Sequence, residues 1–209
     1  LLLNETRIEE LASGLHDILK LEDPTGKVLL EKKMENGLFI QKMSVPIGVV
    51  GVIYESRPNV TIDVAALCLY AGNAVVLRGG SDAEHTNRIL VDLIHQALRE
   101  NGVDVNAIQL MPVDRKFVKE LLEAVKYVDI IIPRGSQNLI DYVRDNSKVP
   151  VIETGAGIVH VYFDSSGDVR KGADIVFNSK TRRVSVCNAL DCLIVHKSRL
   201  PDLFELTKR

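Results

Sequence analysis

A cysteine that follows several basic side chains is the feature of this sequence best suited to covalent chemistry. Cys187 comes shortly after Lys180, Arg182 and Arg183, and a short apolar run begins at Cys192. A thiol attacks as its thiolate, and nearby cations raise the thiolate fraction by lowering the thiol pKa. A lone cysteine is also commonly a buried, unreactive apolar side chain. The local composition alone favours the buried interpretation, so the rest of the chain must decide.

Three loops that follow apolar runs each contain an arginine and a serine. They are residues 54–57, 78–81 and 133–136, and the last two also contain glycine. Glycine lets backbone amides approach a ligand, a helix start offers free N–H groups to an anion, and arginine binds phosphate or carboxylate through two parallel hydrogen bonds. Any one such loop is more often a plain turn with a helix N-cap than a phosphate site, but two basic, glycine-bearing loops after successive strands favour a phosphate site more than one does. The G-x-G-x-x-G fingerprint is absent, so a standard dinucleotide turn is not indicated.

Short apolar runs alternate with segments of helical spacing through most of the chain. Helices are expected at residues 1–21, 58–70, 82–101, 115–126, 136–144 and 168–179, and strands at 47–53, 74–77, 108–111, 128–132, 149–153, 159–163 and 192–195. A hairpin is expected at residues 27–45, around Asn36-Gly37. The alternation predicts an α/β fold with a doubly wound, mostly parallel sheet that binds ligands beyond the carboxyl ends of its strands.

The apolar stripe of the long helix at residues 82–101 is expected to face the sheet. It consists of Ile89, Leu90, Leu93, Ile94 and Ala97. A glycine-rich break at residues 155–157 predicts a domain boundary, with residues 1–154 as one domain and residues 155–209 as the start of a second. The chain opens without a methionine and stops within a helical pattern, so we expect a fragment whose second domain is incomplete.

Composition excludes several classes of protein. The chain has 209 residues, of which 46% are hydrophobic and 26% charged, as in soluble globular proteins. A formal net charge of -2 argues against a general nucleic-acid binder, and the scattered histidines and three cysteines show no metal-ligand spacing. No signal peptide and no run long enough to span a bilayer appear, so we expect no membrane partner and a reducing, cytoplasmic location.

Several motifs together resemble a known family. Residues 45–53 and 71–77 are similar to the first two cofactor-domain strands of the aldehyde dehydrogenase superfamily. Within that superfamily, residues 54–61, 77–81 and 131–136, with Val186-Cys187-Asn188-Ala189, resemble γ-glutamyl phosphate reductases. The resemblance covers nearly the whole chain and about the middle half of the family's reductase. In animals and plants that reductase is fused behind a glutamate kinase, as the bifunctional pyrroline-5-carboxylate synthase, which would allow a mitochondrial location.

The resemblance implies a reaction in proline biosynthesis. L-Glutamyl 5-phosphate is reduced with NADPH to L-glutamate 5-semialdehyde and phosphate. Cys187 would be the nucleophile and would carry a thioester, which divides one difficult reaction into two easier ones. The full-length protein is expected to be a homo-oligomer that binds only small molecules.

The family also implies residues for the cofactor. Arg78 stands where the superfamily has a lysine on the adenosine ribose, and with Gly79, Gly80 and Ser81 it suits a 2′-phosphate, which favours NADPH over NADH. A second group, which falls where the superfamily sets a helix N-terminus near the pyrophosphate, consists of Arg134, Gly135 and Ser136.

Substrate and oxyanion positions follow in the same way. Arg57, Lys180 and Arg182 would hold the α-carboxylate or the leaving phosphate, although each is also explained as solvated surface charge. The Cys187 backbone N–H would stabilise the oxyanion, with Asn59 as the nearest side-chain amide. Glu153 lies where the superfamily has a hydrolytic glutamate. Because an acyl-phosphate reductase need not activate water, we expect a structural or proton-relay role for it.

The chain also departs from the family pattern. Arg183, Val184 and Ser185 stand where the family has a proline and a small residue before the cysteine, and Val159 replaces a common cysteine. The first change is close enough to the nucleophile to alter the turn that positions the thiol. Two alternatives therefore remain open: a relative that oxidises an aldehyde or uses acyl-CoA, and an inactive fragment or paralogue that keeps only the fold.

Overall fold

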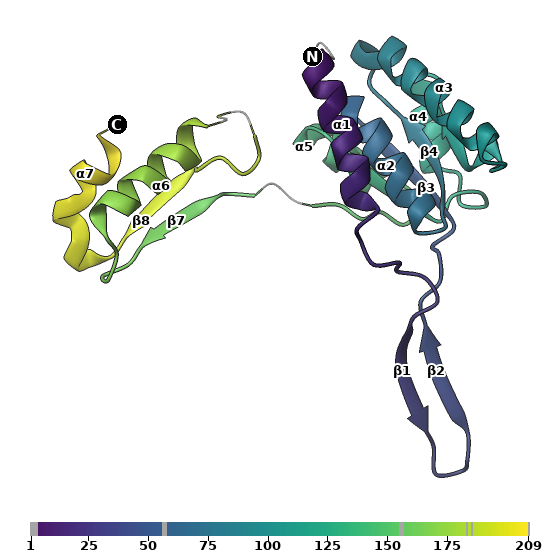
Figure 1. Ribbon diagram of the computed structural model, residues 1–209, viewed down its shortest axis with the longest axis horizontal. Helices are drawn as coiled ribbons and strands as arrows, with labels where there is room; N and C mark the ends of the chain where they lie inside the picture. The colour runs from purple at the N-terminus through teal and green to yellow at the C-terminus, as the bar shows by residue number, and fades with distance from the viewer. Residues whose placement is uncertain (1–3, 56–57, 155–156, 183, 185, 209) are drawn as a thin grey trace. The chain divides into compact units, whose positions relative to one another are not determined.

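The computed structural model describes residues 4–55, 58–154, 157–182, 184 and 186–208 (Figure 1). The chain divides into two units, Leu1–Glu153 and Thr154–Arg209, and each is treated by itself. The division lies close to the glycine-rich break. The assignment of a cofactor-binding role to the first unit and a catalytic role to the second stays a prediction.

A four-stranded parallel sheet organises the first unit. Its strands are β3 (Val49–Tyr54), β4 (Ala74–Arg78), β5 (Ile108–Leu110) and β6 (Ile130–Arg134), in the order β5-β4-β3-β6. The chain moves outward from β3 to β5 and then returns to the other side of β3, so the predicted doubly wound topology is confirmed. Because all four strands are parallel, the loops that follow them meet at one edge of the sheet.

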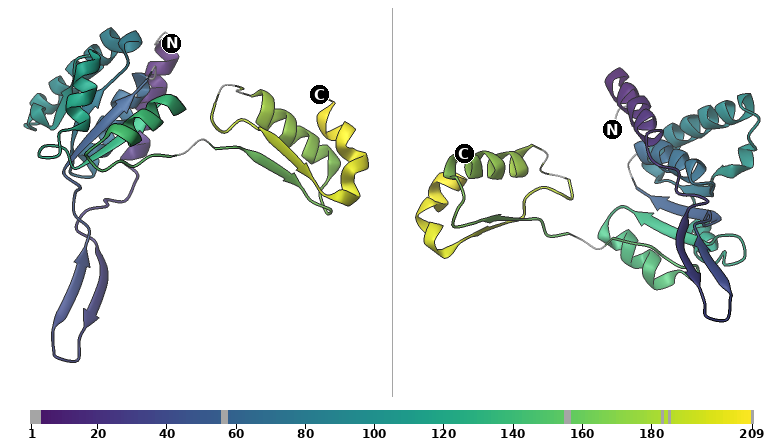
Figure 2. Two further views of the ribbon diagram at one scale, coloured as in Figure 1. Left: turned by 180° about the vertical axis from the view of Figure 1, so that it is seen from behind. Right: turned by 60° about the horizontal axis from the view of Figure 1, so that its bottom comes forward.

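Helices cover both faces of this sheet (Figure 2). Val52 and Ile53 point to opposite faces, because successive side chains of a strand alternate. The side of Val52 packs against α2 (Pro58–Tyr70) and α3 (Glu84–Glu100), whereas the side of Ile53 packs against α4 (Arg115–Leu122) and α5 (Gln137–Asn146). Short 3₁₀ turns, η1 (Ser81–Ala83) and η2 (Val105–Ala107), precede α3 and β5, and α1 (Glu5–Ile18) lies against α2.

Two expectations about this unit are wrong in detail. In α3, Leu90 of the expected stripe is buried and Ile94 packs against the core, but Ile89 and Leu93 are 60% and 56% exposed, and Asn87, Val91 and Leu98 are buried as well. The helix carries apolar side chains on more than one side, and contact with the sheet decides which side is covered. Residues 149–153 form no full strand, because their pairing with β6 is a single parallel bridge between Ile131 and Val151.

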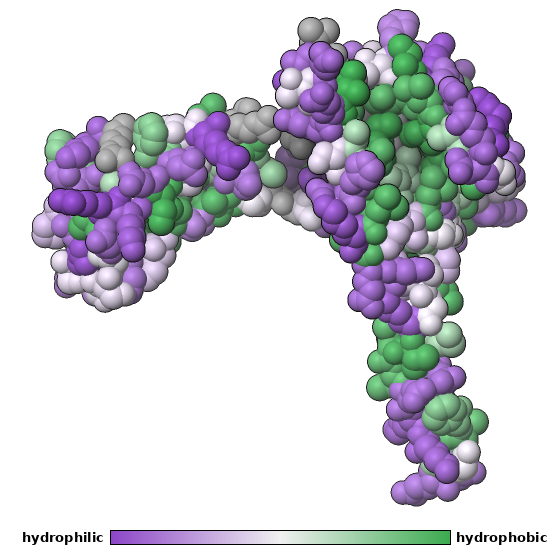
Figure 3. Space-filling view, in the orientation of Figure 1, coloured by the Kyte–Doolittle hydropathy of each residue, from purple (hydrophilic) through white to green (hydrophobic). Residues whose placement is uncertain are grey.

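The predicted hairpin is present. β1 (Val28–Lys33) and β2 (Phe39–Met43) pair in antiparallel fashion, and Gly37 in the turn has a φ of +88°, which glycine adopts without strain. Every residue of both strands is exposed, and the surface of the hairpin mixes polar with apolar side chains (Figure 3).

The second unit is small and again has parallel strands. β7 (His160–Phe163) and β8 (Cys192–Val195) are joined through α6 (Val169–Thr181), whose N-cap Asp168 accepts a hydrogen bond from the Lys171 backbone N–H. Phe163, Ala173, Val176 and Leu206 are buried, and η3 (Lys197–Asp202) leads into α7 (Leu203–Thr207), which packs on α6. In the described residues of both units, no helix has the length and apolar character needed to cross a membrane.

Candidate active site

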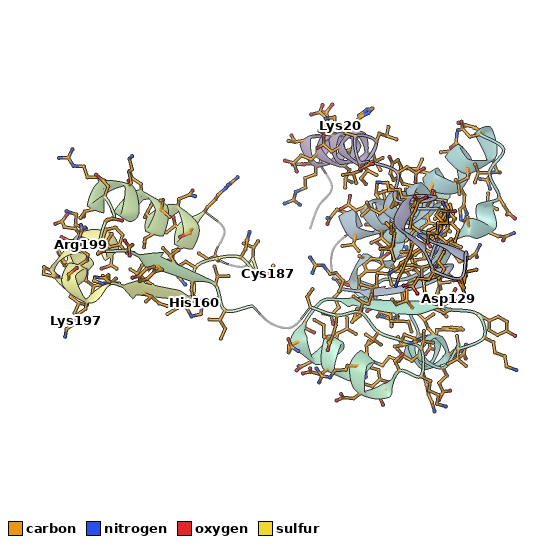
Figure 4. All side chains as sticks on the ribbon, turned by 90° about the horizontal axis from the view of Figure 1, so that it is seen from below. Lys20, Asp129, His160, Cys187, Lys197 and Arg199 are labelled. Atoms are coloured by element: carbon orange, nitrogen blue, oxygen red, sulfur yellow. The ribbon has the colours of Figure 1, made fainter. Side chains whose placement is uncertain are left out.

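Cys187 lies at the surface, in the loop that joins α6 to β8 (Figure 4). The base of this loop is closed by hydrogen bonds from the Leu190 N–H to the Ser179 carbonyl, 3.0 Å, and from the Lys180 ammonium to the Leu190 carbonyl, 2.9 Å. Ala189 and Leu190 are buried, so the loop is anchored just after the cysteine. The local interpretation of Cys187 as a buried side chain is therefore wrong.

The three cysteines differ in access to solvent. Cys68 in α2 is buried, and burial raises the pKa of its thiol to about 11, so it is protonated at neutral pH. Cys192 in β8 is half-buried, whereas Cys187 is exposed. A reaction that begins with attack by a thiolate needs an accessible thiol, and exposure singles out Cys187.

The basic residues before Cys187 occupy different places. The Lys180 ammonium donates to the Leu190 carbonyl, which gives it a part in closing the loop whatever it does with a substrate. Arg182 is exposed and caps the end of α6, where its N–H donates to the Asn178 carbonyl. Arg183 and Ser185 lie outside the described residues. The roles of Lys180 and Arg182 in substrate binding stay predictions.

At the end of β3, a carboxylate occupies the start of α5. The Glu55 side chain accepts hydrogen bonds from the Ser136 backbone N–H, 2.8 Å, and from the Ser136 hydroxyl, 3.3 Å. A Cβ atom on Gly135 would lie 2.5 Å from the Glu55 Oε2 atom, so only glycine fits there without a shift. Carboxylates are favoured at helix N-termini. The sequence placed a cofactor pyrophosphate at this helix start, and its binding would require Glu55 to turn away.

At the end of β4, Arg78 carries a guanidinium whose hydrogen bonds are incomplete. Its Nη2 atom donates to the Val113 carbonyl at 2.5 Å, and its buried Nε atom has no partner among the described residues. Burial lowers the pKa of Arg78, the nearby Arg115 lowers it further, and Glu55 opposes both. A second cation beside a desolvated guanidinium leaves positive charge that an anion would neutralise.

Arg115 is a residue that the sequence analysis missed. It begins α4, where Asp114 is the N-cap and accepts from the Lys116 N–H. The described part of the chain offers it no ion pair with a carboxylate. The position of Arg115 in the sequence could have identified it. Arg115 follows β5 closely, and the loops after β3, β4 and β6 were already candidates at the same edge of the sheet.

Beside Arg78, the two glycines of its loop are buried, whereas Ser81 begins η1 and is exposed. Gly79 borders a cavity of about 270 Å³ between α3 and the segment that follows β5. Its lining combines apolar with polar side chains: Glu84, Asn87, Arg88, Val91, Asp92, His95, Gln109, Leu110, Met111, Pro112 and Val113.

The remaining candidates have local partners or cannot be placed. Asn59 is exposed in α2 and donates from Nδ2 to the Asp63 carboxylate of the same helix at 3.3 Å, and Arg57 lies outside the described residues. Glu153 is 3.4 Å from the Arg144 guanidinium, and its Oε2 atom is buried without a hydrogen-bond partner in the described part of the chain. Hydrogen bonding to Asp145 is the main cause that raises the pKa of Arg144, so this cation stays charged beside Glu153.

Known proteins resemble this chain in sequence and in fold. The model of the aldehyde dehydrogenase family matches residues 11–209. The chain belongs to the aldehyde dehydrogenase family. The gamma-glutamyl phosphate reductase of Chlorobaculum parvum is 60% identical over 203 residues, which are 97% of this chain and 48% of that protein. The gamma-glutamyl phosphate reductase of Bacteroides fragilis is 56% identical over 96% of this chain and 48% of its own length.

A solved structure extends the likeness to the fold. The crystal structure of gamma-glutamyl phosphate reductase from Thermotoga maritima superimposes with a TM-score of 0.87 and 42% sequence identity, over 95% of this chain and 48% of that one. The predicted aldehyde dehydrogenase-like α/β fold is thereby confirmed. The chain spans about half the length of the relatives it matches.

Proposed function

We propose that the full-length protein is an NADPH-dependent γ-glutamyl phosphate reductase of proline biosynthesis. It reduces L-glutamyl 5-phosphate to L-glutamate 5-semialdehyde and releases phosphate. The observation that carries the proposal is the exposed Cys187, the accessible thiol of the chain, on a loop closed at its base by Leu190 and Lys180. The names and identities of the relatives support the choice of substrate.

Cys187 acts first. Its thiolate attacks the acyl carbon of the substrate, the carbon–sulfur bond forms, and the bond to the phosphate oxygen breaks so that phosphate leaves with the electron pair. The oxyanion that forms during attack is stabilised by backbone N–H donors near the sulfur. NADPH, which Arg78 and Arg115 would hold, would supply the hydride that, with a proton, reduces the thioester on Cys187. Release of the Cys187 sulfur then yields the aldehyde.

The residues at the end of β4 fit the 2′-phosphate of NADPH. The Arg78 guanidinium has a buried Nε atom without a partner among the described residues, and Arg115 contributes a second positive charge. A phosphate would neutralise both cations and accept hydrogen bonds from the arginine fork. NADH lacks that phosphate and therefore its interaction with the two cations, so NADPH is the preferred cofactor.

The proposed reaction does not require Glu153. The Arg144 guanidinium lies 3.4 Å from the Oε1 atom of this carboxylate, and its buried Oε2 atom has no hydrogen-bond partner in the described part of the chain. A general base needs an oxygen free to accept a proton from water. Acyl-phosphate reduction requires no such base.

The proposal is tested in the reverse direction with the full-length protein. Glutamate 5-semialdehyde is supplied with NADP⁺ or NAD⁺, with and without inorganic phosphate, and NADPH or NADH formation is followed at its absorbance. We expect sustained turnover with NADP⁺ only when phosphate is present, because phosphate must accept the acyl group from Cys187. Equal turnover without phosphate would overturn the acyl-phosphate assignment in favour of hydrolysis, and turnover that requires coenzyme A in its place would indicate an acyl-CoA enzyme.

A further inference from the structure

Three polar side chains lie inside the first unit, where apolar residues surround them. Tyr54, Thr61 and Asn87 are 1%, 0% and 1% exposed. The Tyr54 and Thr61 hydroxyl oxygens are 2.6 Å apart, and the Thr61 hydroxyl donates to the Asn87 Oδ1 atom at 3.0 Å. Because the single hydroxyl proton of Thr61 is directed to Asn87, Tyr54 must donate to Thr61. Burial raises the pKa of Tyr54, which keeps the donor protonated.

This chain of hydrogen bonds has one direction and connects three elements. It runs from the end of β3, through α2, to the first turns of α3. Buried polar groups are costly unless they are paired, so such a network is a constraint on how these elements sit against one another. Because the Asn87 Oδ1 atom accepts the hydrogen bond from Thr61, the orientation of the Asn87 carboxamide is set. Its amide nitrogen therefore points away from Thr61.

The amide nitrogen of Asn87 is turned toward the loop that carries Arg78. A Cβ atom built on Gly79 would lie 2.1 Å from Asn87 Nδ2 and 3.2 Å from the Tyr54 ring. The backbone of Gly79 therefore rests directly on two members of the network. Gly79 and Asn87 also border the same cavity of about 270 Å³.

The other end of the network adjoins the second sheet-end loop. Tyr54 is followed by Glu55, whose N–H donates to the Arg134 carbonyl and whose side chain accepts from Ser136. In the register of the sheet, Ile53 pairs with Arg78 and Tyr54 pairs with Arg134. One buried network thus adjoins the loops after β3, β4 and β6.

We propose that Tyr54, Thr61 and Asn87 are positioning residues for cofactor binding, which hold the Gly79 backbone so that Arg78 is presented in its binding conformation. This inference rests on the proposed function, since it assumes that Arg78 binds NADPH. The network does not touch the reacting atoms, so it acts on cofactor affinity and leaves the chemical step of Cys187 unchanged. A loop held before the ligand arrives loses less conformational freedom when it binds.

The test compares Thr61→Val with Thr61→Ser in the full-length enzyme. Valine keeps the shape of threonine but removes the hydroxyl that links Tyr54 to Asn87, whereas serine keeps that hydroxyl. For Thr61→Val we expect the KM for NADP⁺ to rise by about threefold to tenfold, the loss of roughly one hydrogen bond, with kcat and the KM for glutamate 5-semialdehyde within about twofold of wild type. Thr61→Ser should restore the wild-type KM.

A merely structural network would give a different result. It would lower the melting temperature of Thr61→Val while the KM for NADP⁺ stayed at the wild-type value, and that outcome overturns the inference. If Thr61→Val fails to fold, Tyr54→Phe removes a single hydroxyl and must show the same selective rise in KM. Wild-type enzyme that does not use NADP⁺ contradicts the proposed function itself, whereas normal use of NADP⁺ with unchanged KM in the variants contradicts only the network.

Discussion

The two units support their reactive or binding loops in different ways. In Leu1–Glu153, the Arg78 loop rests on fully buried side chains, and the loops after β3 and β6 are connected to it by strand register and by Glu55. In Thr154–Arg209, the loop of Cys187 is closed by backbone hydrogen bonds and one lysine, and its cysteine is exposed. The difference matches the two proposed tasks, because a loop that binds a phosphate gains from being held in place whereas a nucleophile needs access.

The largest effect is expected at the nucleophile. Cys187→Ser in the full-length enzyme should lower kcat by at least about 10³-fold, because an alcohol at neutral pH is a far weaker nucleophile than a thiolate. Cys68→Ser is the matched control and should retain near wild-type turnover, because Cys68 is buried and its pKa of about 11 keeps it unreactive. Steady-state assays decide, and wild-type turnover by Cys187→Ser would remove the basis of the mechanism.

The next largest effect is expected at the Arg78 loop of the first unit. Arg78→Ala should raise the KM for NADP⁺ by roughly 10- to 100-fold, since hydrogen bonds to charged groups contribute about 1.5–3 kcal/mol. The KM for NAD⁺ should change little, because NAD⁺ lacks the 2′-phosphate. Arg115→Ala should also raise the KM for NADP⁺, but by a smaller factor. Equal losses with both cofactors would assign these arginines to another part of the dinucleotide.

A smaller effect is expected at the base of the cysteine loop. Lys180→Met keeps the length of the side chain and removes its hydrogen bond to the Leu190 carbonyl. We expect kcat to fall by about threefold to tenfold, in line with one lost hydrogen bond, while the KM for NADP⁺ is unchanged. Lys171→Met, an exposed lysine on the same helix, is the control. A large rise in the KM for the aldehyde would instead support the prediction that Lys180 binds substrate.

The smallest effect is expected at Glu153. Glu153→Gln removes the charge that pairs with Arg144 but keeps the shape, so phosphate-dependent turnover should stay within about threefold of wild type. Phosphate-dependent rates of the wild type and of Glu153→Gln are then compared from about pH 6 to about pH 9. If Glu153 relays a proton, one arm of the wild-type pH–rate curve should be missing in the variant. A loss of several orders of magnitude would make Glu153 an essential base and would revive the hydrolytic alternative.

The sequence predicted the fold better than the site. The segments Pro58–Tyr70 and Cys192–Val195 were predicted with their observed bounds, because strong periodicity and turn residues delimit them. The buried side of α3 was predicted only in part, because Ile89 and Leu93, which are exposed, are as apolar as Leu90, which is buried. The burial of Asn87 follows from how α3 packs on the sheet, and no local sequence pattern indicates it.

The contacts that support the site depend on partners far apart in the chain. Tyr54, Thr61 and Asn87 form one network only after β3, α2 and α3 are assembled. Glu55 reaches Ser136 across two neighbouring strand ends, and no local pattern contains that contact. Motif resemblance directed attention to Cys187 and Arg78, but it gave no indication of Arg115 or of the loop-closing hydrogen bond of Lys180.

The most direct test of the central claim is detection of the acyl group on Cys187. Full-length enzyme is incubated with glutamate 5-semialdehyde and NADP⁺ without phosphate, quenched in acid, digested and analysed by mass spectrometry. The account predicts a glutamyl thioester on the peptide that contains Cys187, which disappears when inorganic phosphate is added before the quench. NADPH formation without any acylated Cys187, or with the acyl group on Cys68 or Cys192, would contradict it.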